Sequence, residues 1–138
     1  MLKYTFLLLA LAGLALAAAP ARAQVAVVAH PGVADDAADA GTLVGIYNLD
    51  QTRWSDGSAV VPFDASTAAQ DAFYGAIGQS TGQIKKVWLR KKLSGEGQPP
   101  ESLGSDAEVL QKVASTPGAV GFVSADAVDG SVKVLATF

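Results

Sequence analysis

The sequence predicts an α/β fold: a single compact domain with a mixed, partly parallel sheet flanked by helices. Apolar runs rich in β-branched residues alternate with segments whose apolar residues repeat at helical spacing. Strands separated by helices favour parallel strand pairs with helices packed on the faces of the sheet. Removing residues 1–23 from the 138 leaves 115, which is enough for one domain and too few for two.

The first 23 residues are typical of a secretory signal peptide. Lys3 supplies a basic start, an uninterrupted apolar run covers residues 6–19, and Ala21 and Ala23 form the small-x-small cleavage pattern. A retained membrane anchor is the alternative, but a spanning helix needs about 20 apolar residues. We therefore expect cleavage after Ala23. Since the chain has no cysteine for lipid attachment, we expect a periplasmic protein of residues 24–138 without a stable membrane anchor.

Charge and cysteine content narrow the possible partners and the source of stability. The chain has ten basic and thirteen acidic residues, and Lys3 and Arg22 belong to the leader, so eight basic against thirteen acidic residues remain. This net charge of −5 argues against a nucleic-acid partner. Without cysteine there is no disulfide, so burial of apolar side chains must stabilise the domain.

The first part of the mature region predicts two strands and one helix. The β-branched run 24–30 predicts a buried strand that Pro31-Gly32 ends. The acidic segment 33–39 predicts a loop. In 41–49 the apolar residues fall at i, i+3 and i+4, as in a helix, and 59–63 predicts the second strand.

Three helices are then expected in succession. Ser66-Thr67 precedes a helical stripe that Gly78 ends, so we expect a hydroxyl cap at that helix start. A second helix covers about 80–93. Ser105 and Glu108, three residues apart, predict a capping box at the start of the third.

Two strands are expected at the end of the chain. Pro117-Gly118 ends the last helix, and 119–123 predicts a short strand. The segment 131–137 alternates around Val132, Val134 and Ala136, which predicts a final strand.

Three motifs, in this order, cover nearly the whole of this region. The first motif consists of Ile46-Tyr47, Trp54 and residues 55–62. The second consists of Trp88-Leu89-Arg90, residues 93–95, Gly97 and Pro99-Pro100. The third consists of residues 105–108 and 117–123. Together they resemble the periplasmic phosphate-binding-protein-like family, the substrate-binding components of phosphate ABC transporters.

The resemblance implies one lobe of a type II periplasmic binding protein. It also implies an exported, non-enzymatic solute-binding module for phosphate or a similar small oxyanion, with an ABC permease or another periplasmic protein as partner and no cofactor. Full-length members have two lobes that close on the ligand. In the family a serine-rich turn, often preceded by an arginine, holds the anion, whereas Pro62–Ala68 lacks the arginine and the glycine. The alternative function is therefore a non-catalytic periplasmic interaction domain that has lost its ligand.

Ser66 and Thr67 are the main candidates for anion binding. The first amides of a helix lack internal partners, the helix dipole adds positive charge, and a hydroxyl can donate to an anion oxygen. Ligands of open α/β sheets bind at the carboxyl ends of strands, where this turn is expected. Asp64 could accept a proton from a protonated oxyanion. A plain helix cap is the alternative interpretation.

Arg90 is the fourth candidate, within a basic cluster formed by Lys85, Lys86 and 90–92. It matches the family's arginine, and its planar fork could bind an oxyanion at two points. Lys91 falls on the buried stripe of the helix. A solvated face that complements the helix dipole is the alternative.

Metal binding and hydrolysis are not expected. His30 is the only histidine, and the nearby residues Asp35, Asp36 and Asp39 lack the spacing of a calcium loop. A triad of His30, Ser66 and Asp64 can be drawn, but the sequence has neither a nucleophile elbow nor a recognisable oxyanion hole.

Overall fold

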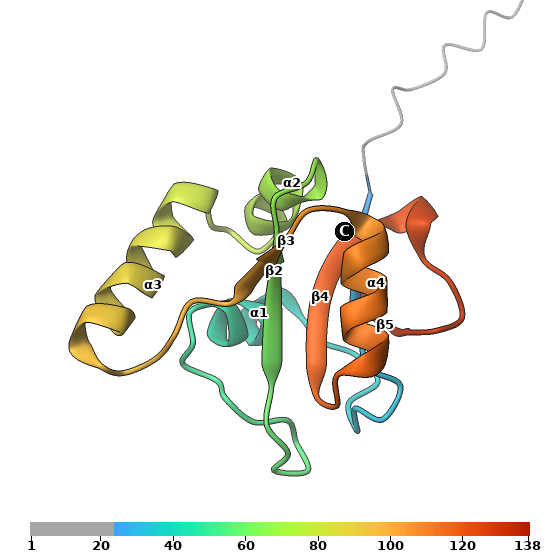
Figure 1. The fold of residues 1–138 in the computed structure, drawn as a ribbon, viewed down its shortest axis with the longest axis horizontal. Coiled ribbons are helices and arrows are strands. Elements are labelled where there is room, and N and C mark those ends of the chain that lie inside the picture. The colour runs from blue at the N-terminus through green and yellow to red at the C-terminus, as the bar shows by residue number, and fades with distance from the viewer. Residues whose placement is uncertain (1–23) are drawn as a thin grey trace, which may run out of the picture.

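The computed structural model describes residues 24–138 (Figure 1), and the expected signal peptide lies outside the described residues. In chain order the elements are β1 (Val25–Ala29), α1 (Ala40–Tyr47), β2 (Val61–Ala65), α2 (Ala69–Ala76), α3 (Thr81–Ser94), β3 (Glu101–Leu103), α4 (Asp106–Ser115), β4 (Ala119–Ser124), the 3-10 turn η1 (Ala125–Ala127) and β5 (Lys133–Thr137). Within 24–138 every helix is too short or too polar to span a bilayer.

The strands form one mixed sheet in the order β3-β2-β4-β1-β5. Strand β2 is parallel to β3 and β4, whereas β1 is antiparallel to β4 and β5. The α/β class and the partly parallel sheet are therefore confirmed. The sequence did not predict β3, because three residues, two of them polar and exposed, are too few to establish an alternating pattern.

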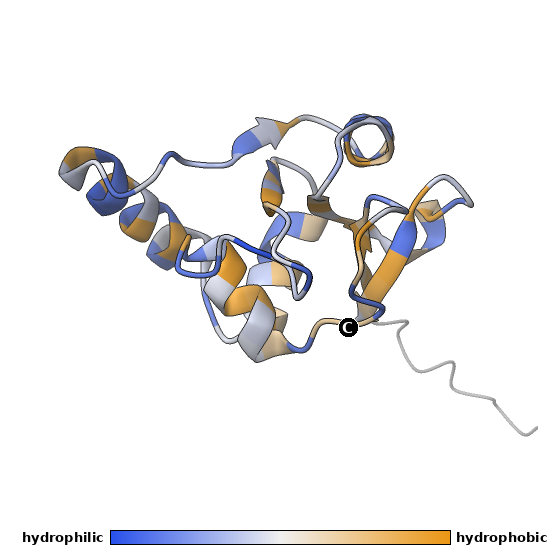
Figure 2. Cartoon of the chain, turned by 90° about the horizontal axis from the view of Figure 1, so that it is seen from below, coloured by the Kyte–Doolittle hydropathy of each residue, from blue (hydrophilic) through white to orange (hydrophobic). Residues whose placement is uncertain are grey.

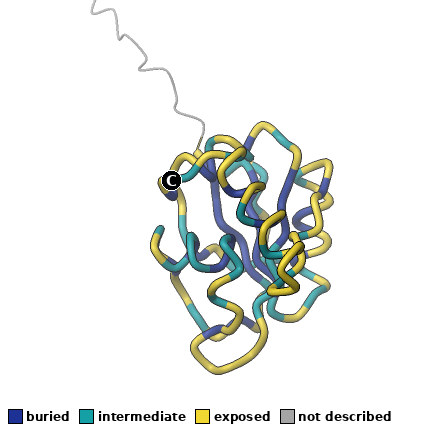
Figure 3. Tube along the Cα trace, turned by 90° about the vertical axis from the view of Figure 1, so that its left-hand side faces the viewer, coloured by how far each residue is buried: buried dark blue, intermediate teal, exposed yellow. Residues whose placement is uncertain are grey.

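Two neighbouring residues of β4 show how the helices cover the sheet. Side chains alternate along a strand. A Cβ added to Gly121 would meet Val109 and Val113 of α4, and the ring of Phe122 packs on the opposite face. In Figure 1, α4 passes in front of β4 and α1 lies behind the sheet. Strands β1 and β4 form the buried centre of the molecule (Figure 3).

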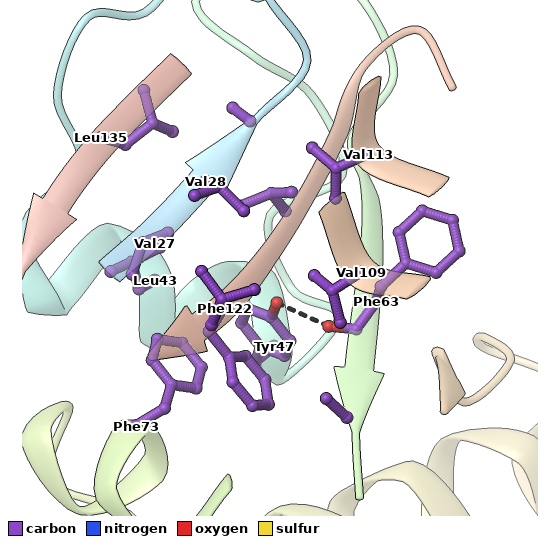
Figure 4. Close-up of a cluster of buried hydrophobic side chains, with 14 of the residues drawn as sticks. Val27, Val28, Leu43, Tyr47, Phe63, Phe73, Val109, Val113, Phe122 and Leu135 are labelled. Atoms are coloured by element: carbon purple, nitrogen blue, oxygen red, sulfur yellow. Dashed lines mark hydrogen bonds between the residues drawn. The ribbon is translucent and has the colours of Figure 1, made fainter. Parts of the chain in front are cut away.

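An aromatic cluster fills the core between the sheet and the helices α1 and α2. Phe73 stacks on Phe122 with ring centroids 4.4 Å apart, and Tyr47 packs edge-on against Phe73. The Tyr47 hydroxyl donates a 2.8 Å hydrogen bond to the carbonyl oxygen of Phe63 (Figure 4). Burial raises the pKa of Tyr47, so the hydroxyl remains a donor at neutral pH.

Two expectations about helix starts need correction. Helix α2 begins after Ala68, which makes no side-chain cap bond, and the expected hydroxyl cap is limited to Thr67, whose Oγ1 accepts from the amide of Ala69. The Ser66 amide instead donates to the carbonyl oxygen of Leu103, which extends the β2–β3 pairing by one residue. At α4 the capping box is half formed: Ser105 accepts from the Glu108 amide, but the Glu108 carboxylate accepts from Gly104.

The last strand departs from the expected alternation at Val134 and Leu135, although Val132 and Ala136 pack against the core as expected. Leu135 is buried, whereas Val134 is 41% exposed. The cause is an irregularity in the β1–β5 register between Val27 and Val28, which shifts the pairing by one position. Leu135 is the extra residue between Val134 and Ala136, which pair with Val28 and Val27.

Gly118 joins two of the resemblance motifs. Its φ is +79°, and an added Cβ would lie 2.2 Å from the carbonyl oxygen of Ala59. The Trp54 indole donates to the Gly118 carbonyl oxygen at 3.0 Å. These residues therefore stabilise the fold and do not line the candidate site.

Candidate functional site

The candidate site lies where β2 and β3 end side by side. In their parallel register Asp64 is opposite Ser102, and Ala65 is opposite Leu103. Residues at i and i+2 of a strand share a face, so Asp64, Ser66 and Ser102 lie on one side of this edge. Helix α3 and the segment after it cover that side.

Asp64 forms a fixed, buried carboxyl group at this edge. It is 2% exposed, and its Oδ1 accepts a 2.6 Å hydrogen bond from the Tyr74 hydroxyl. Gln70 donates to both carboxyl oxygens at 3.3 Å. Burial raises the pKa of Tyr74 well above its ordinary value, with further contributions from Tyr47 and Asp64, so Tyr74 remains a donor.

Two serine hydroxyls meet beside this carboxyl group. Ser66 Oγ lies 2.9 Å from Ser102 Oγ, a distance at which either can donate. The Thr67 hydroxyl accepts from the Ala69 amide at 3.3 Å and is turned toward its own helix. Among residues 24–138, the amides of Thr67 and Ala68 have no hydrogen-bond partner.

An open cavity of about 390 Å³ lies in front of the serine pair. Two lysines on α3, Lys85 and Lys92, bring positive charge to it from the side opposite the serines. The cavity is lined by Asp64, Ser66, Lys85, Trp88, Leu89, Lys92, Pro99, Pro100 and Ser102. It therefore combines hydroxyl donors, ammonium groups and an apolar wall.

Helix α3 is held in place by its inner side. The Trp88 indole donates a 2.6 Å hydrogen bond to the Tyr47 carbonyl oxygen, and Ile84 is fully buried. Lys91 lies on this inner side, as its helical position predicts, and pairs with Asp50. Lys85 and Lys92 are seven residues apart, so two turns of the helix bring them to the same side.

The structure brings together two of the four candidate residues. Asp64 and Ser66 line the cavity, and Thr67 lies next to it in sequence with its hydroxyl engaged elsewhere. Arg90 is exposed on α3 and does not line the cavity. The only cations of the basic cluster at the cavity are Lys85 and Lys92, among the described residues.

The triad of His30, Ser66 and Asp64 is wrong as a catalytic arrangement. His30 Nδ1 accepts from the Gly32 amide at 2.9 Å, while Ser66 bonds Ser102 and Asp64 bonds Tyr74. Within 24–138, no three His, Asp or Glu side chains are grouped so that they could hold a metal ion.

Sequence reasoning missed Ser102, Lys85 and Lys92 as site residues. Ser102 belongs to β3, the strand that the pattern did not reveal. Lys85 and Lys92 belong to the basic cluster that the sequence shows. Their i, i+7 spacing places them on the same side of the helix, and this spacing is the signal that could have separated them from Arg90.

Solved structures with the same arrangement of elements were found by comparing folds. One is a proposed substrate-binding protein of a phosphate ABC transporter from Clostridium perfringens, solved with bound phosphate (TM-score 0.67, 16% identity, 82% of this chain and 45% of that chain). Another is an ABC-type phosphate transport receptor from Vibrio cholerae (TM-score 0.64, 20% identity, 82% and 47%). A third is PstS from Borrelia burgdorferi (TM-score 0.59, 15% identity, 83% and 47%).

The chain shares the fold of a part of these phosphate-transport proteins. It spans less than half the length of each of the three proteins. The resemblance that the sequence motifs indicated is therefore confirmed at the level of the fold. No family model and no curated protein sequence matches the chain.

Proposed function

We propose that this chain is an exported, non-enzymatic binding module for phosphate or a similar small oxyanion. The observation that carries the proposal is the cavity in which Ser66 and Ser102 face Lys85 and Lys92. Hydroxyl groups donate directly to anion oxygens, and ammonium groups form charge-assisted hydrogen bonds with them. The fold shared with proteins named for phosphate transport supports the same ligand class.

Asp64 gives the site a preference between protonation states of the ligand. Its carboxyl group lines the cavity, and its two fixed donors leave it lone pairs to accept a further hydrogen bond. An anion that keeps a hydroxyl group can donate to Asp64, whereas a fully ionised oxyanion is repelled. We therefore expect singly protonated phosphate to bind better than sulfate, which has no proton at neutral pH.

A thermal-shift titration of residues 24–138 with phosphate tests the proposal. At a phosphate concentration one hundred times its dissociation constant, binding stabilises the fold by about 2.7 kcal/mol and raises Tm by several degrees. We expect the shift to disappear in the double variants Ser66→Ala/Ser102→Ala and Lys85→Gln/Lys92→Gln. No shift up to millimolar phosphate or sulfate in the parent protein would contradict oxyanion binding.

Matched variants on the same helix distinguish the cavity from general charge effects. Lys86→Gln removes a charge from α3 outside the cavity and should leave the shift intact. Arg90→Gln decides the role of the arginine that the family motif indicates, and the position of the cavity predicts no effect. Thr67→Ala should have a smaller effect than Ser66→Ala, because the Thr67 hydroxyl is bonded within its own turn.

A second candidate function is an interaction domain that keeps the fold without a ligand. Asp64 favours it, because this buried carboxyl group lies on the cavity and forms no ion pair within 24–138. Its charge would oppose a small anion. Absence of any oxyanion-induced shift, with an unchanged fold, would favour this function.

We infer a periplasmic location and a transporter permease or another periplasmic protein as partner. The leader-like segment 1–23 and the transport proteins that share the fold support this inference. Detection of a chain beginning at Gln24 in the periplasmic fraction would test it. A chain that keeps residues 1–23 and remains with the membrane would contradict it.

A further inference from the structure

Helix α3 has an outward face of exposed residues, one edge of which borders the candidate cavity. Ile84 and Trp88 are buried on its inner side, whereas Leu89 and Leu93 are 56% and 79% exposed. Leucines four residues apart lie next to each other on a helix surface. Figure 1 places α3 at one end of the molecule, and Figure 2 shows apolar segments among the hydrophilic ones along it.

Exposed cations surround the two leucines. On the helical wheel Lys86 lies beside them, Arg90 lies on one flank, and Lys85 and Lys92 lie on the other. We call Lys85, Lys86, Leu89, Arg90, Lys92 and Leu93 the basic leucine face. None of its four cations forms an ion pair within 24–138, where the pairs join Lys91, Lys112 and Lys133 to carboxylates.

The charge of the described chain is strongly polarised. Only Arg53, Lys112 and Lys133 provide positive charge outside α3, whereas every acidic residue lies outside this helix. The complement of the basic leucine face is therefore a negatively charged surface that also accepts apolar side chains. Carboxylates farther than about 10 Å from this face are largely screened at 0.1 M salt, so the overall negative charge does not prevent such a contact.

We propose that the basic leucine face docks reversibly on a membrane surface that carries anionic headgroups. Interfacial helices combine leucines that enter the headgroup region with lysines and arginines beside them. Each Lys or Arg near an anionic surface adds to the attraction. The position of α3 at the end of the molecule lets a plane reach the face without displacing the sheet.

Two other occupants fit the face less well. If two copies paired α3 against α3, the same four cations of each would meet, and like charges repel. A helix that fills a protein groove uses anchors at i, i+3 or i+4, and i+7, whereas this face has two leucines one turn apart. A bilayer needs no such match of shape.

Vesicle sedimentation with residues 24–138, which contain the whole described fold and its core, tests the proposal. The vesicles are phosphatidylcholine with 30% phosphatidylglycerol or phosphatidylcholine alone, in 50 mM and 300 mM salt. We expect sedimentation only with the anionic vesicles and at least about tenfold weaker binding at the higher salt. Lys86→Glu/Arg90→Glu should weaken binding at least about tenfold, since each cation near the surface contributes severalfold to affinity.

Leu93→Ser and Lys112→Glu complete the design. Leu93 lines no described cavity, so Leu93→Ser should weaken vesicle binding severalfold while any phosphate-induced thermal shift remains. Lys112→Glu reverses a positive charge on α4, outside the basic leucine face, and this variant should bind vesicles with an affinity within about twofold of the parent. Failure to bind anionic vesicles, or equal loss in Lys112→Glu and Lys86→Glu/Arg90→Glu, would overturn the proposal. In the first case an acidic protein would be the remaining occupant.

Discussion

The Tyr74 hydroxyl donates a 2.6 Å hydrogen bond to Oδ1 of Asp64, and both groups are buried where β2 passes into α2. This bond links the end of the strand to the last turn of the next helix. It also fixes the carboxyl group that lines the candidate cavity. The geometry of the site and the stability of the domain therefore depend on the same contact.

Tyr74→Phe is expected to destabilise the domain by about 1–3 kcal/mol, because it leaves the buried Asp64 carboxyl group without its shortest donor. Urea unfolding followed by far-UV circular dichroism measures this loss. The Tyr74 ring packs edge-on against Trp88, and phenylalanine keeps that contact.

Asp64→Asn in the Tyr74→Phe background separates the hydrogen bond from packing. If the lost donor causes the destabilisation, the two changes should be non-additive, since each removes part of one interaction. Additive losses would mean that the destabilisation by Tyr74→Phe does not come from its hydrogen bond to Asp64.

Gly121→Ala should destabilise the domain by about 1–3 kcal/mol through overpacking. Its added Cβ would lie 2.8 Å from Val109 Cγ1 and 3.2 Å from Val113 Cγ2, so α4 would have to move away from β4. Gly130→Ala is the control, because an added Cβ there meets no atom within 4 Å. Equal unfolding midpoints for the two variants would show that α4 does not pack on β4 this closely.

The phase of β5 can be tested with two adjacent residues. Leu135→Ala is expected to cost about 2–5 kcal/mol, as for other buried leucines, whereas Val134→Ala should stay within about 0.5 kcal/mol. Chemical unfolding of both variants decides between the observed phase and the one predicted from the sequence. A larger loss for Val134→Ala would favour the latter.

The longer elements of this fold could be predicted from the sequence because their apolar patterns are unambiguous. Leu43, Ile46 and Tyr47 form the buried stripe of α1 as predicted. The phase of β5 could not be predicted, because it depends on an irregularity in the pairing with β1 that leaves no mark in the local pattern. Tertiary pairing, and not local alternation, turned Leu135 inward.

The candidate site was only partly accessible to sequence reasoning for a similar reason. Asp64 and Ser66 follow from the expected strand-to-helix turn. Ser102 comes from a three-residue strand that exists because β2 offers it an edge to pair with. The choice of Lys85 and Lys92 over Arg90 depends on how α3 is rotated against Tyr47, which the Trp88 hydrogen bond fixes.

Asp39 predicts a specific pH dependence at the start of α1. Its Oδ1 accepts from the Thr42 amide at 2.8 Å, and this bond to the backbone holds the pKa of Asp39 below its ordinary value near 3.8. A carboxyl group with a lowered pKa in the folded state stabilises fully above the unfolded value, and this contribution is lost as the pH falls through the folded value.

Asp39→Ala should therefore lower Tm at pH 7, and its deficit relative to the parent should shrink below about pH 4. Asp39→Asn keeps the acceptor without the charge, so its deficit at pH 7 should be smaller. An Asp39→Ala deficit that is the same at pH 3 and pH 7 would show that the ionisation of Asp39 adds nothing to the stability of the helix start.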